Sequence, residues 1–379
     1  MNKLYIEKID ALRGIAILLV LSYHTLLIIC PNFEAKTYSD SGFLIINNIK
    51  SLILTFNPIG QGAMGVELFL VISGFLIHLN YLKNGSSFSA KEFFSKRFWR
   101  IYPPYFLVLI FFSFMQKDFS LKGFFDIITH VFFVHNLSNR TFFAINPSFW
   151  SLALEFQLYL IYPLYLVLLK YFSASKTTII VLSLNLALSI FGCVSGYNSL
   201  TYTAFVLKFW IVWCSGAFLA DRYYNKKRIF YKPFVWFLLF YALFLSFKLF
   251  KVTSFFMLLP ASLTCLALIE TFLQNESLSR FTINRLFIKV LTFIGLISYS
   301  IYLIHQPILE GLIQFYKPST EGPIINTVLG VTLAYLTIIL ISYLFYKLIE
   351  LRSISFGQKI RKKGLLSTNT NVMSVKVSK

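Results

Sequence analysis

Two ionisable residues, Arg13 and His24, stand out because they lie in one apolar stretch of the chain. Residues 9–30 are apolar for long enough to cross a bilayer as a helix, yet they include Asp10, Arg13 and His24. Ionisable groups are costly at bilayer depth and are seldom placed there for packing alone. Arg13 and His24 are eleven residues apart. That is close to three helical turns, so the two side chains share a face, about 16 Å apart along the axis. This face presents a cation near one membrane surface and an imidazole toward the other.

A cationic cluster is predicted on the side of the membrane where Arg13 lies. Arg97 and Arg100 immediately precede the third apolar stretch, with Lys96 beside them, and the topology places them near the level of Arg13. The planar guanidinium makes forked, charge-assisted hydrogen bonds that suit phosphate groups. The alternative interpretation of Arg97 and Arg100 is charge that sets topology ahead of a membrane span.

A second cluster is predicted in the other half of the bilayer. The second and fourth apolar stretches enter from the opposite surface, which places Glu67 and Glu155 at about the depth of His24. A carboxylate beside an imidazole in a low-dielectric site fixes the tautomer and lets the imidazole act as a general base. The two clusters suit one ligand with phosphates at one end and a reactive group at the other, and acyl-coenzyme A has this form. The alternative for each buried group is a polar contact between helices.

The composition indicates which elements must hold these residues. The chain of 379 residues is 57% hydrophobic and 13% charged, whereas globular chains are about 25% charged. We therefore expect an all-α, polytopic membrane bundle of about ten helices, embedded in the lipid bilayer, with no soluble domain. The net charge of +20 comes largely from short loops, which favours a role in topology over nucleic-acid binding. The expected spans lie near 9–30, 62–82, 101–116, 149–169, 177–195, 202–220, 233–250, 254–273, 290–314 and 324–348.

The distribution of Lys and Arg predicts the orientation. With the N-terminus inside, the inner segments hold 25 basic residues and the outer segments hold eight, so both termini are predicted to be cytoplasmic. Residues 1–350 are expected to form one membrane domain, and residues 351–379 a basic cytoplasmic tail that is disordered beyond Lys363. Segments 43–57 and 121–137 are apolar but interrupted by polar residues, so they are predicted to lie on the membrane surface or to re-enter.

Five short stretches, spread over most of the chain, are similar to the motifs of a known family. On these stretches the chain resembles the acyltransferase-3 family of integral membrane acyltransferases, which modify bacterial surface carbohydrates among other substrates. The stretches are Ile9–Gly14 followed by His24, Gly65–Ile77 with its acidic Glu67, Arg97–Pro103 with Arg-x-x-Arg, Trp150–Glu155 with Ser-x-x-x-Glu, and Gly295 with Ser298–His305.

The resemblance implies a donor, an acceptor and a place. The donor is cytoplasmic acyl-CoA, usually acetyl-CoA, and the acceptor is a hydroxyl of a cell-surface polysaccharide, such as the O-antigen of lipopolysaccharide, or of its lipid-linked precursor. The expected location is the bacterial inner membrane. The resemblance assigns catalysis to His24, an essential role on the same helix to Arg13, the donor side to Arg97 and Arg100, and the pocket to Ser151 and Glu155.

The predicted site combines these roles with the reasoning from depth. Glu67 or Glu155 is expected to orient His24. Ser298, Tyr302 and His305 share one helix face, with pocket lining and interhelical hydrogen bonding as the two interpretations. The complete set is His24, Glu67 and Glu155 for catalysis, Arg13, Arg97 and Arg100 for the donor, and Asp10, Ser151, Tyr302 and His305 in the pocket.

Several alternatives stay open at this point. His24 could act as a general base or carry the acyl group itself. A transporter or flippase of a lipid-linked sugar or an anion would also suit ten spans with buried charges, and the acceptor could be a lipid or an antibiotic.

Some family members carry a fused extracytoplasmic hydrolase-like domain. This sequence shows none, so a stand-alone enzyme is expected and a peptidoglycan acceptor is not. The four cysteines lack metal-ligand spacing, so no metal is expected.

Overall fold

The protein is a bundle of membrane-length helices. The structure, a computed structural model, describes residues 3–29, 61–62, 64–196, 199–250, 252, 254–274, 285–316 and 324–362. Within these residues eight helices are long and apolar enough to cross a membrane, or nine if one bent pair counts as a span, and no strand occurs. The predicted all-α, polytopic bundle is therefore confirmed. The long helices are α1 (Lys3–Ile29), α4 (Met64–Lys83), α5 (Ala90–Gln116), α7 (Trp150–Tyr171), α8 (Ala174–Ser195), α10 (Val206–Tyr224), α12 (Ser254–Gln274) and α15 (Ile324–Phe345).

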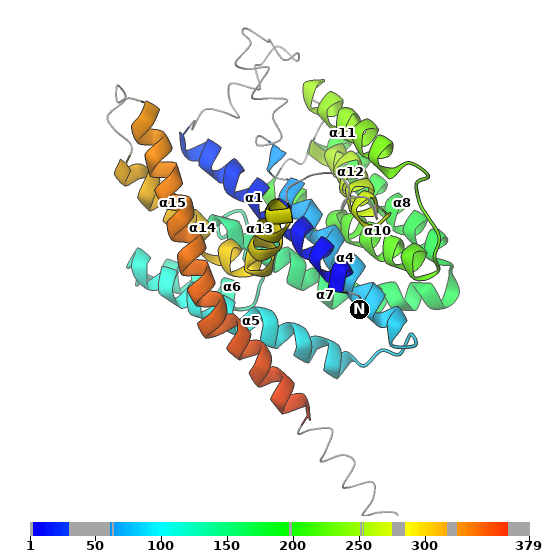
Figure 1. The fold of residues 1–379 in the computed structure, drawn as a ribbon, viewed down its shortest axis with the longest axis horizontal. Helices are drawn as coiled ribbons and strands as arrows, with labels where there is room; N and C mark the ends of the chain where they lie inside the picture. The colour runs from blue at the N-terminus through cyan, green and yellow to red at the C-terminus, as the bar shows by residue number, and fades with distance from the viewer. Residues whose placement is uncertain are drawn as a thin grey trace, which may run out of the picture.

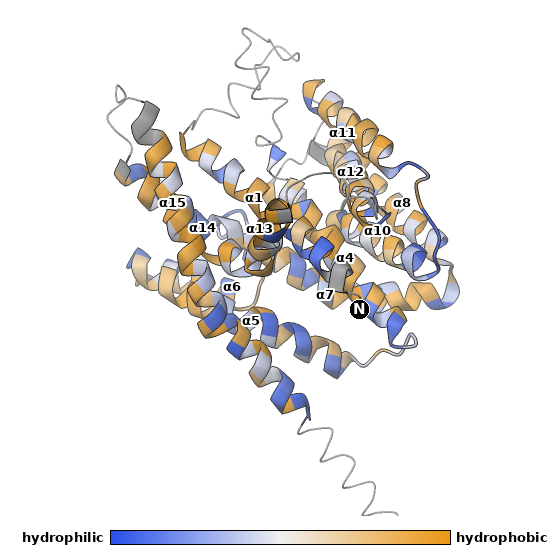
Figure 2. Ribbon diagram, viewed as in Figure 1, coloured by the Kyte–Doolittle hydropathy of each residue, from blue (hydrophilic) through white to orange (hydrophobic). Residues whose placement is uncertain are grey.

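Shorter helices complete the bundle, and its outer surface is apolar. Helix α1 packs against α4, α13 and α14 near the middle of the molecule (Figure 1). The outward faces of the long helices are hydrophobic over most of their length (Figure 2), as expected of surfaces that meet lipid. The shorter helices are α6 (Leu121–Val131), α9 (Leu200–Thr203), α11 (Pro233–Leu249), α13 (Arg285–Leu296) and α14 (Ser298–Tyr316).

Glycine lets the site-bearing helices approach closely. At the α1–α13 crossing, a Cβ added to Gly295 would lie 1.7 Å from the carbonyl oxygen of Asp10, and one added to Gly14 would lie 2.2 Å from that of Leu291. Small residues at helix crossings are a main source of packing energy inside membranes, because lipid tails remove most of the hydrophobic drive between helices. The Gly14–Gly295 contact therefore fixes the position of α1 next to Arg13 and one helical turn from Asp10.

The predicted span 290–314 is a broken one. Helices α13 and α14 are bent by 77° at Ile297, whose side chain is fully buried. The apolar pattern continues through the break, so hydropathy gives no sign of it. Because of the bend, α13 accompanies the half of α1 that carries Arg13, while α14 turns toward the half that carries His24.

Helix α5 begins eleven residues before the predicted start at 101. Ser89 caps it by accepting a hydrogen bond of 3.3 Å from the backbone N–H of Glu92, as N-cap serines do. The Arg-x-x-Arg motif therefore lies on a helix and not in a loop. Pro103 lies inside this helix and cannot bond the carbonyl four residues before it. Ser353 donates to that carbonyl, of Trp99, at 2.5 Å.

Three further segments are predicted from the sequence: 121–137, the tail after residue 350, and 43–57. Helix α6 is 11 residues long, too short to cross a bilayer, and it exposes Leu121 and Phe124, in line with a surface-lying segment at 121–137. The helix that follows α15 runs on to Lys362, across the predicted boundary at residue 350. Segment 43–57, and the tail beyond that helix, lie outside the described residues.

Candidate active site

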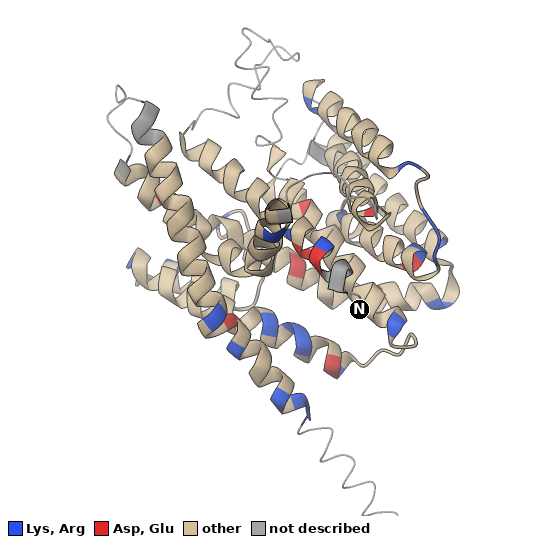
Figure 3. Ribbon diagram, in the orientation of Figure 1, with Lys and Arg blue, Asp and Glu red and all other residues tan. Residues whose placement is uncertain are grey.

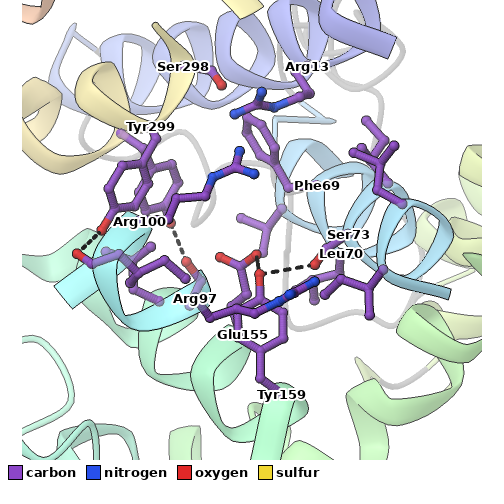
Figure 4. Close-up of a pocket in the computed structure, with 18 of the residues that line it drawn as sticks. Arg13, Phe69, Leu70, Ser73, Arg97, Arg100, Glu155, Tyr159, Ser298 and Tyr299 are labelled. Atoms are coloured by element: carbon purple, nitrogen blue, oxygen red, sulfur yellow. Dashed lines mark hydrogen bonds between the residues drawn. The ribbon is translucent and has the colours of Figure 1, made fainter. Parts of the chain in front are cut away.

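A cavity of about 470 Å³ lies between α1, α4, α5, α7 and α14. Four cations and one carboxylate line it, and most of its remaining wall is apolar. Figure 4 shows the guanidinium groups of Arg13, Arg97 and Arg100 directed into this space around the carboxylate of Glu155. Arg13 comes from α1, Glu155 from α7 and the other two arginines from α5, with Lys96 beside them on the wall. The structure thus brings the predicted donor-side residues into one place, hereafter the arginine cavity.

Two of the three arginines, Arg13 and Arg97, are held by contacts outside the cavity. Arg13 pairs with Asp10, one turn away on α1, with an N–O distance of 3.4 Å, so Asp10 supports the cavity without being part of its lining. Arg97 lies over the ring of Phe93, 4.1 Å from the ring centroid, and donates to the carbonyl of Phe93 at 3.4 Å. Cation–π contact of this kind favours a partly desolvated guanidinium. The cationic groups are therefore preorganised around the cavity.

Glu155 belongs to the arginine cavity and not to the surroundings of His24. The hydroxyl of Tyr159 donates to its carboxylate, and Ser73 lies 3.2 Å from that hydroxyl. Depth along a helix is what the sequence gives, but the direction in which the side chain points depends on how the helix is rotated in the bundle. Helix α7 turns Glu155 toward α5, where Arg97 and Arg100 lie.

The far wall of the arginine cavity leads to His24. Tyr302 lines the cavity, its hydroxyl bonds Ser151, and its ring centroid lies 5.5 Å from that of His305. The ring of His305 in turn lies 5.2 Å from that of His24, at an interplanar angle of 52°. His305 is fully buried whereas His24 is partly exposed. Two imidazoles therefore lie side by side, one residue beyond the cavity wall.

Hydrogen bonds fix the tautomer of His305. Its Nδ1 lies 2.9 Å from the carbonyl oxygen of Tyr302, and a carbonyl only accepts, so Nδ1 carries a proton. In the neutral ring the lone pair is then on Nε2, which lies 3.4 Å from the hydroxyl of Ser148. An imidazole held in this way is oriented, and in its neutral form it presents its lone pair in a defined direction.

A comparison with known protein families identifies the family of this chain. Residues 6–347 match a family model described as an acyltransferase domain. The chain belongs to this acyltransferase family. No solved structure matches the chain.

Several named proteins are similar to part of this chain. The peptidoglycan O-acetyltransferase OatA of Listeria monocytogenes is 29% identical over 193 residues, 46% of this chain and 26% of that protein. YrhL of Bacillus subtilis, provisionally named for the same activity, is 27% identical over 192 residues, 45% of this chain and 25% of that protein. A regulator of hypoxia-inducible factor 1 from Caenorhabditis elegans is 30% identical over 126 residues, 30% of this chain and 25% of that protein. The matched part thus spans about a quarter of each relative.

Glu67, a predicted catalytic residue of this acyltransferase, does not line the cavity. It lies on α4 but is rotated away from Val66 and Leu70, which line the cavity. Its Oε2 is buried and has no hydrogen-bond partner among the described residues. Across the described part of the chain, no hydrogen bond or ion pair joins His24 to Glu67 or Glu155. The neighbour that the structure gives to His24 is His305.

Three polar residues of the histidine site were not anticipated. The hydroxyl of Ser148 donates to the Oε1 of Gln306 at 2.5 Å, and the Nε2 of Gln306 donates to Glu310 at 3.1 Å. A signal existed, since Gln306 and Glu310 form an i, i+4 polar pair on a strongly apolar segment. Ser148 gave no such signal, because it lies in a turn before α7, 157 residues from His305.

Metal ligands do not gather in this part of the molecule. In the described ranges no group of three or more His, Cys, Asp or Glu side chains could hold a metal ion.

Proposed function

We propose that this protein is a membrane-embedded O-acetyltransferase. It takes an acetyl group from acyl-CoA bound at the arginine cavity and transfers it to a hydroxyl of a cell-surface polysaccharide or of its lipid-linked precursor. One observation carries the proposal: a cavity lined by Arg13, Arg97 and Arg100 leads through Tyr302 to paired imidazoles at His24. Family membership supports the acyl chemistry.

The donor end follows from charge. Three guanidiniums with Lys96 and a single carboxylate, Glu155, leave the cavity strongly cationic, which suits the phosphates of coenzyme A. Hydrogen bonds to charged groups contribute about 1.5–3 kcal/mol each, and guanidinium–phosphate pairs add directional fit. The apolar wall beside Tyr302 would accept the flexible arm that carries the thioester.

The transfer step uses His24 as base. The acceptor hydroxyl gives its proton to the imidazole as its oxygen attacks the thioester carbon, the carbon–sulfur bond breaks, and the thiolate leaves and takes the proton back. His305 is the positioning residue: its ring, fixed by the Tyr302 carbonyl, holds His24 in place. This replaces the orienting carboxylate expected from the sequence. The covalent alternative, with the acyl group on His24 nitrogen, predicts an acyl-enzyme when donor is supplied without acceptor.

The acceptor class comes from the relatives and the family. The relatives OatA and YrhL are named for peptidoglycan, whereas the resemblance favours polysaccharides outside the peptidoglycan. Mass spectrometry of lipopolysaccharide glycan and of peptidoglycan, from cells with and without the gene, separates the two. Loss of an acetyl mass from one fraction assigns the acceptor, and no loss from either contradicts a carbohydrate acceptor.

The enzymatic test compares two histidines on membrane helices, the partly exposed His24 and the buried His78. The full-length protein in lipid nanodiscs receives radiolabelled acetyl-CoA and, as acceptor, the glycan fraction so identified, prepared unacetylated from cells without the gene. We expect His24→Gln to lower transfer by about 10²–10⁴-fold, the usual contribution of a general base. His78→Gln is the matched control, because His78 also lies on a membrane helix but bonds the Tyr162 hydroxyl at 3.2 Å. Wild-type transfer by His24→Gln would remove His24 from the mechanism.

A further inference from the structure

A second cavity, of about 420 Å³, lies where the C-terminal ends of α4, α10 and α12 meet. Lys83 of α4 lines it, together with Lys226, Lys227 and Arg228 from the turn after α10. The one carboxylate on its wall is Glu270 of α12. The arginine cavity shares none of these residues. This basic cavity is a separate feature of the molecule.

The turn that carries three of the cations is fixed by Glu270. Its two carboxylate oxygens accept from the backbone N–H groups of Ile229 at 2.8 Å and Phe230 at 3.1 Å, and Gln274 donates to it at 2.8 Å. Both oxygens are therefore occupied by the backbone of the turn. A carboxylate used in this way holds the cations in position without forming an ion pair with them.

Among the described residues, the cations at the rim form no ion pair within 4 Å, although Arg228 lies near enough to Glu270 to interact with it electrostatically. Lys226, Lys227 and Arg228 are exposed and take part in neither of the two ion pairs within 4 Å that the described residues show. Cations also stabilise helix C-termini and set membrane topology, but a loop without fixed structure would serve both roles. Neither role explains why these cations line a cavity, or why Glu270 holds their turn by its backbone.

The surroundings of the basic cavity are those of a membrane interface. Tyr223 and Tyr224 line it and are 39% and 48% exposed, and the nearby Tyr231 and Trp236 are 80% and 41% exposed. Tyr and Trp gather at the headgroup level of bilayers. Figure 3 shows basic residues concentrated around the turn that follows α10. With the predicted orientation, this side faces the cytoplasmic leaflet, which is rich in anionic lipid.

We propose that the basic cavity binds the phosphate group of an anionic phospholipid at the cytoplasmic face. Basic pockets between membrane helices on this side are suited to such head groups, because the phosphate meets the cations while the acyl chains stay in the bilayer. Helix α4 also lines the arginine cavity, through Leu76 and Asn80. A lipid bound at the basic cavity would therefore influence the position of α4. The same chemistry would accept a soluble phosphate, so the test has an arm for each source.

The test uses the delipidated full-length protein in detergent, with native mass spectrometry as the readout. The probes are short-chain phosphatidylglycerol, phosphatidylcholine with the same chains, and inorganic phosphate. We expect phosphatidylglycerol to bind in preference to phosphatidylcholine. The double variant Lys226→Gln, Lys227→Gln should weaken this binding by roughly tenfold or more, since each surface cation contributes appreciably to anionic-lipid binding. The variant Lys226→Arg, Lys227→Arg should retain it.

A matched control removes two lysines from the helix ends that flank another short turn. Lys170→Gln, Lys176→Gln lowers the net charge equally at the end of α7 and the start of α8 and should leave binding unchanged. Binding of inorganic phosphate that is lost only in the Lys226–Lys227 variant would assign the cavity to a soluble phosphate. Equal phosphatidylglycerol binding by wild type and that variant, or an equal loss in the control, overturns the proposal.

Discussion

The molecule contains two pairs of neighbouring histidines, and the two are built differently. His24 and His305 lie on separate helices with ring centroids 5.2 Å apart and planes tilted by 52°. His130 and His135 lie on one short segment, stacked 3.8 Å apart with planes only 4° from parallel. The first pair borders the arginine cavity through Tyr302. The second is fully buried among Phe149 and its neighbours.

The difference shows that closeness of two imidazoles does not make a catalytic site. A base needs a lone pair that a substrate can reach and a ring held by something other than its reaction partner. The partly exposed His24 meets the first need. For the second need, it lies beside His305, whose ring is held by the Tyr302 carbonyl. In the stacked pair, both ring nitrogens of His135 are buried without a hydrogen-bond partner. Neither nitrogen is therefore open to the surface.

The largest effect on this comparison is expected when one histidine of each pair is replaced and the activities are compared. His305→Gln should lower kcat by about 10²-fold with little change in the KM for acetyl-CoA, because misplacement of a catalytic group costs about this much. The pH dependence of kcat should also shift, since His24 loses its neighbouring ring. His135→Phe should keep wild-type kcat. If His135→Phe is as damaging as His305→Gln, the distinction between the pairs fails.

The stacked pair should instead make the protein sensitive to acid. Burial lowers the pKa of His130 to about 4, and burial together with the neighbouring His130 lowers the pKa of His135. The folded state then binds fewer protons than the unfolded state below about pH 6.5, so stability falls as the pH falls from there through about 4. One such histidine costs about 2 kcal/mol at roughly pH 5.

Thermal unfolding measured across this pH range checks the prediction. His135→Phe keeps a ring in the stack and removes one titrating group, so its melting temperature should fall less steeply with acid than that of the wild type. A profile that is parallel in both proteins would show that the stacked pair does not set the acid response.

The smallest effect concerns the support of the His24–His305 pair. The pairing of His24 with His305 depends on α1 staying against α13 and α14, and a Cβ at Gly295 would meet the Asp10 carbonyl. Gly295→Ala should therefore cost about 1 kcal/mol or more of stability, as overpacking does, and reduce transfer. Gly311→Ala is the control, because nothing lies within 4 Å of its added Cβ, and alanine is the better helix former. Equal melting temperatures for the two variants would contradict the close crossing.

The stacked pair also illustrates what the sequence could and could not predict about the site. Residues 121–137 were assigned to a surface segment from interrupted hydropathy, and α6 fits that. The stacking of His130 on His135 needed the turn between them, which no periodicity reveals. In the same way, depth and charge group Arg13, Arg97 and Arg100, and these three residues line one cavity. Depth groups Glu155 with His24, whereas Glu155 lines the cavity of the arginines.

The sequence by itself determined the membrane-spanning helices, the shared face of Arg13 and His24, and the family motifs, because helical period and hydropathy are local properties of the chain. Only the tertiary structure decided which side chains meet across helices. The rotation of α7 sends Glu155 to the arginines, and the 77° break at Ile297 brings His305 to His24. Both depend on packing between segments far apart in the chain, where a change of one residue in register turns a helix face by ~100°. Depth in the membrane is encoded along the chain, and the direction of each side chain within the bundle is not.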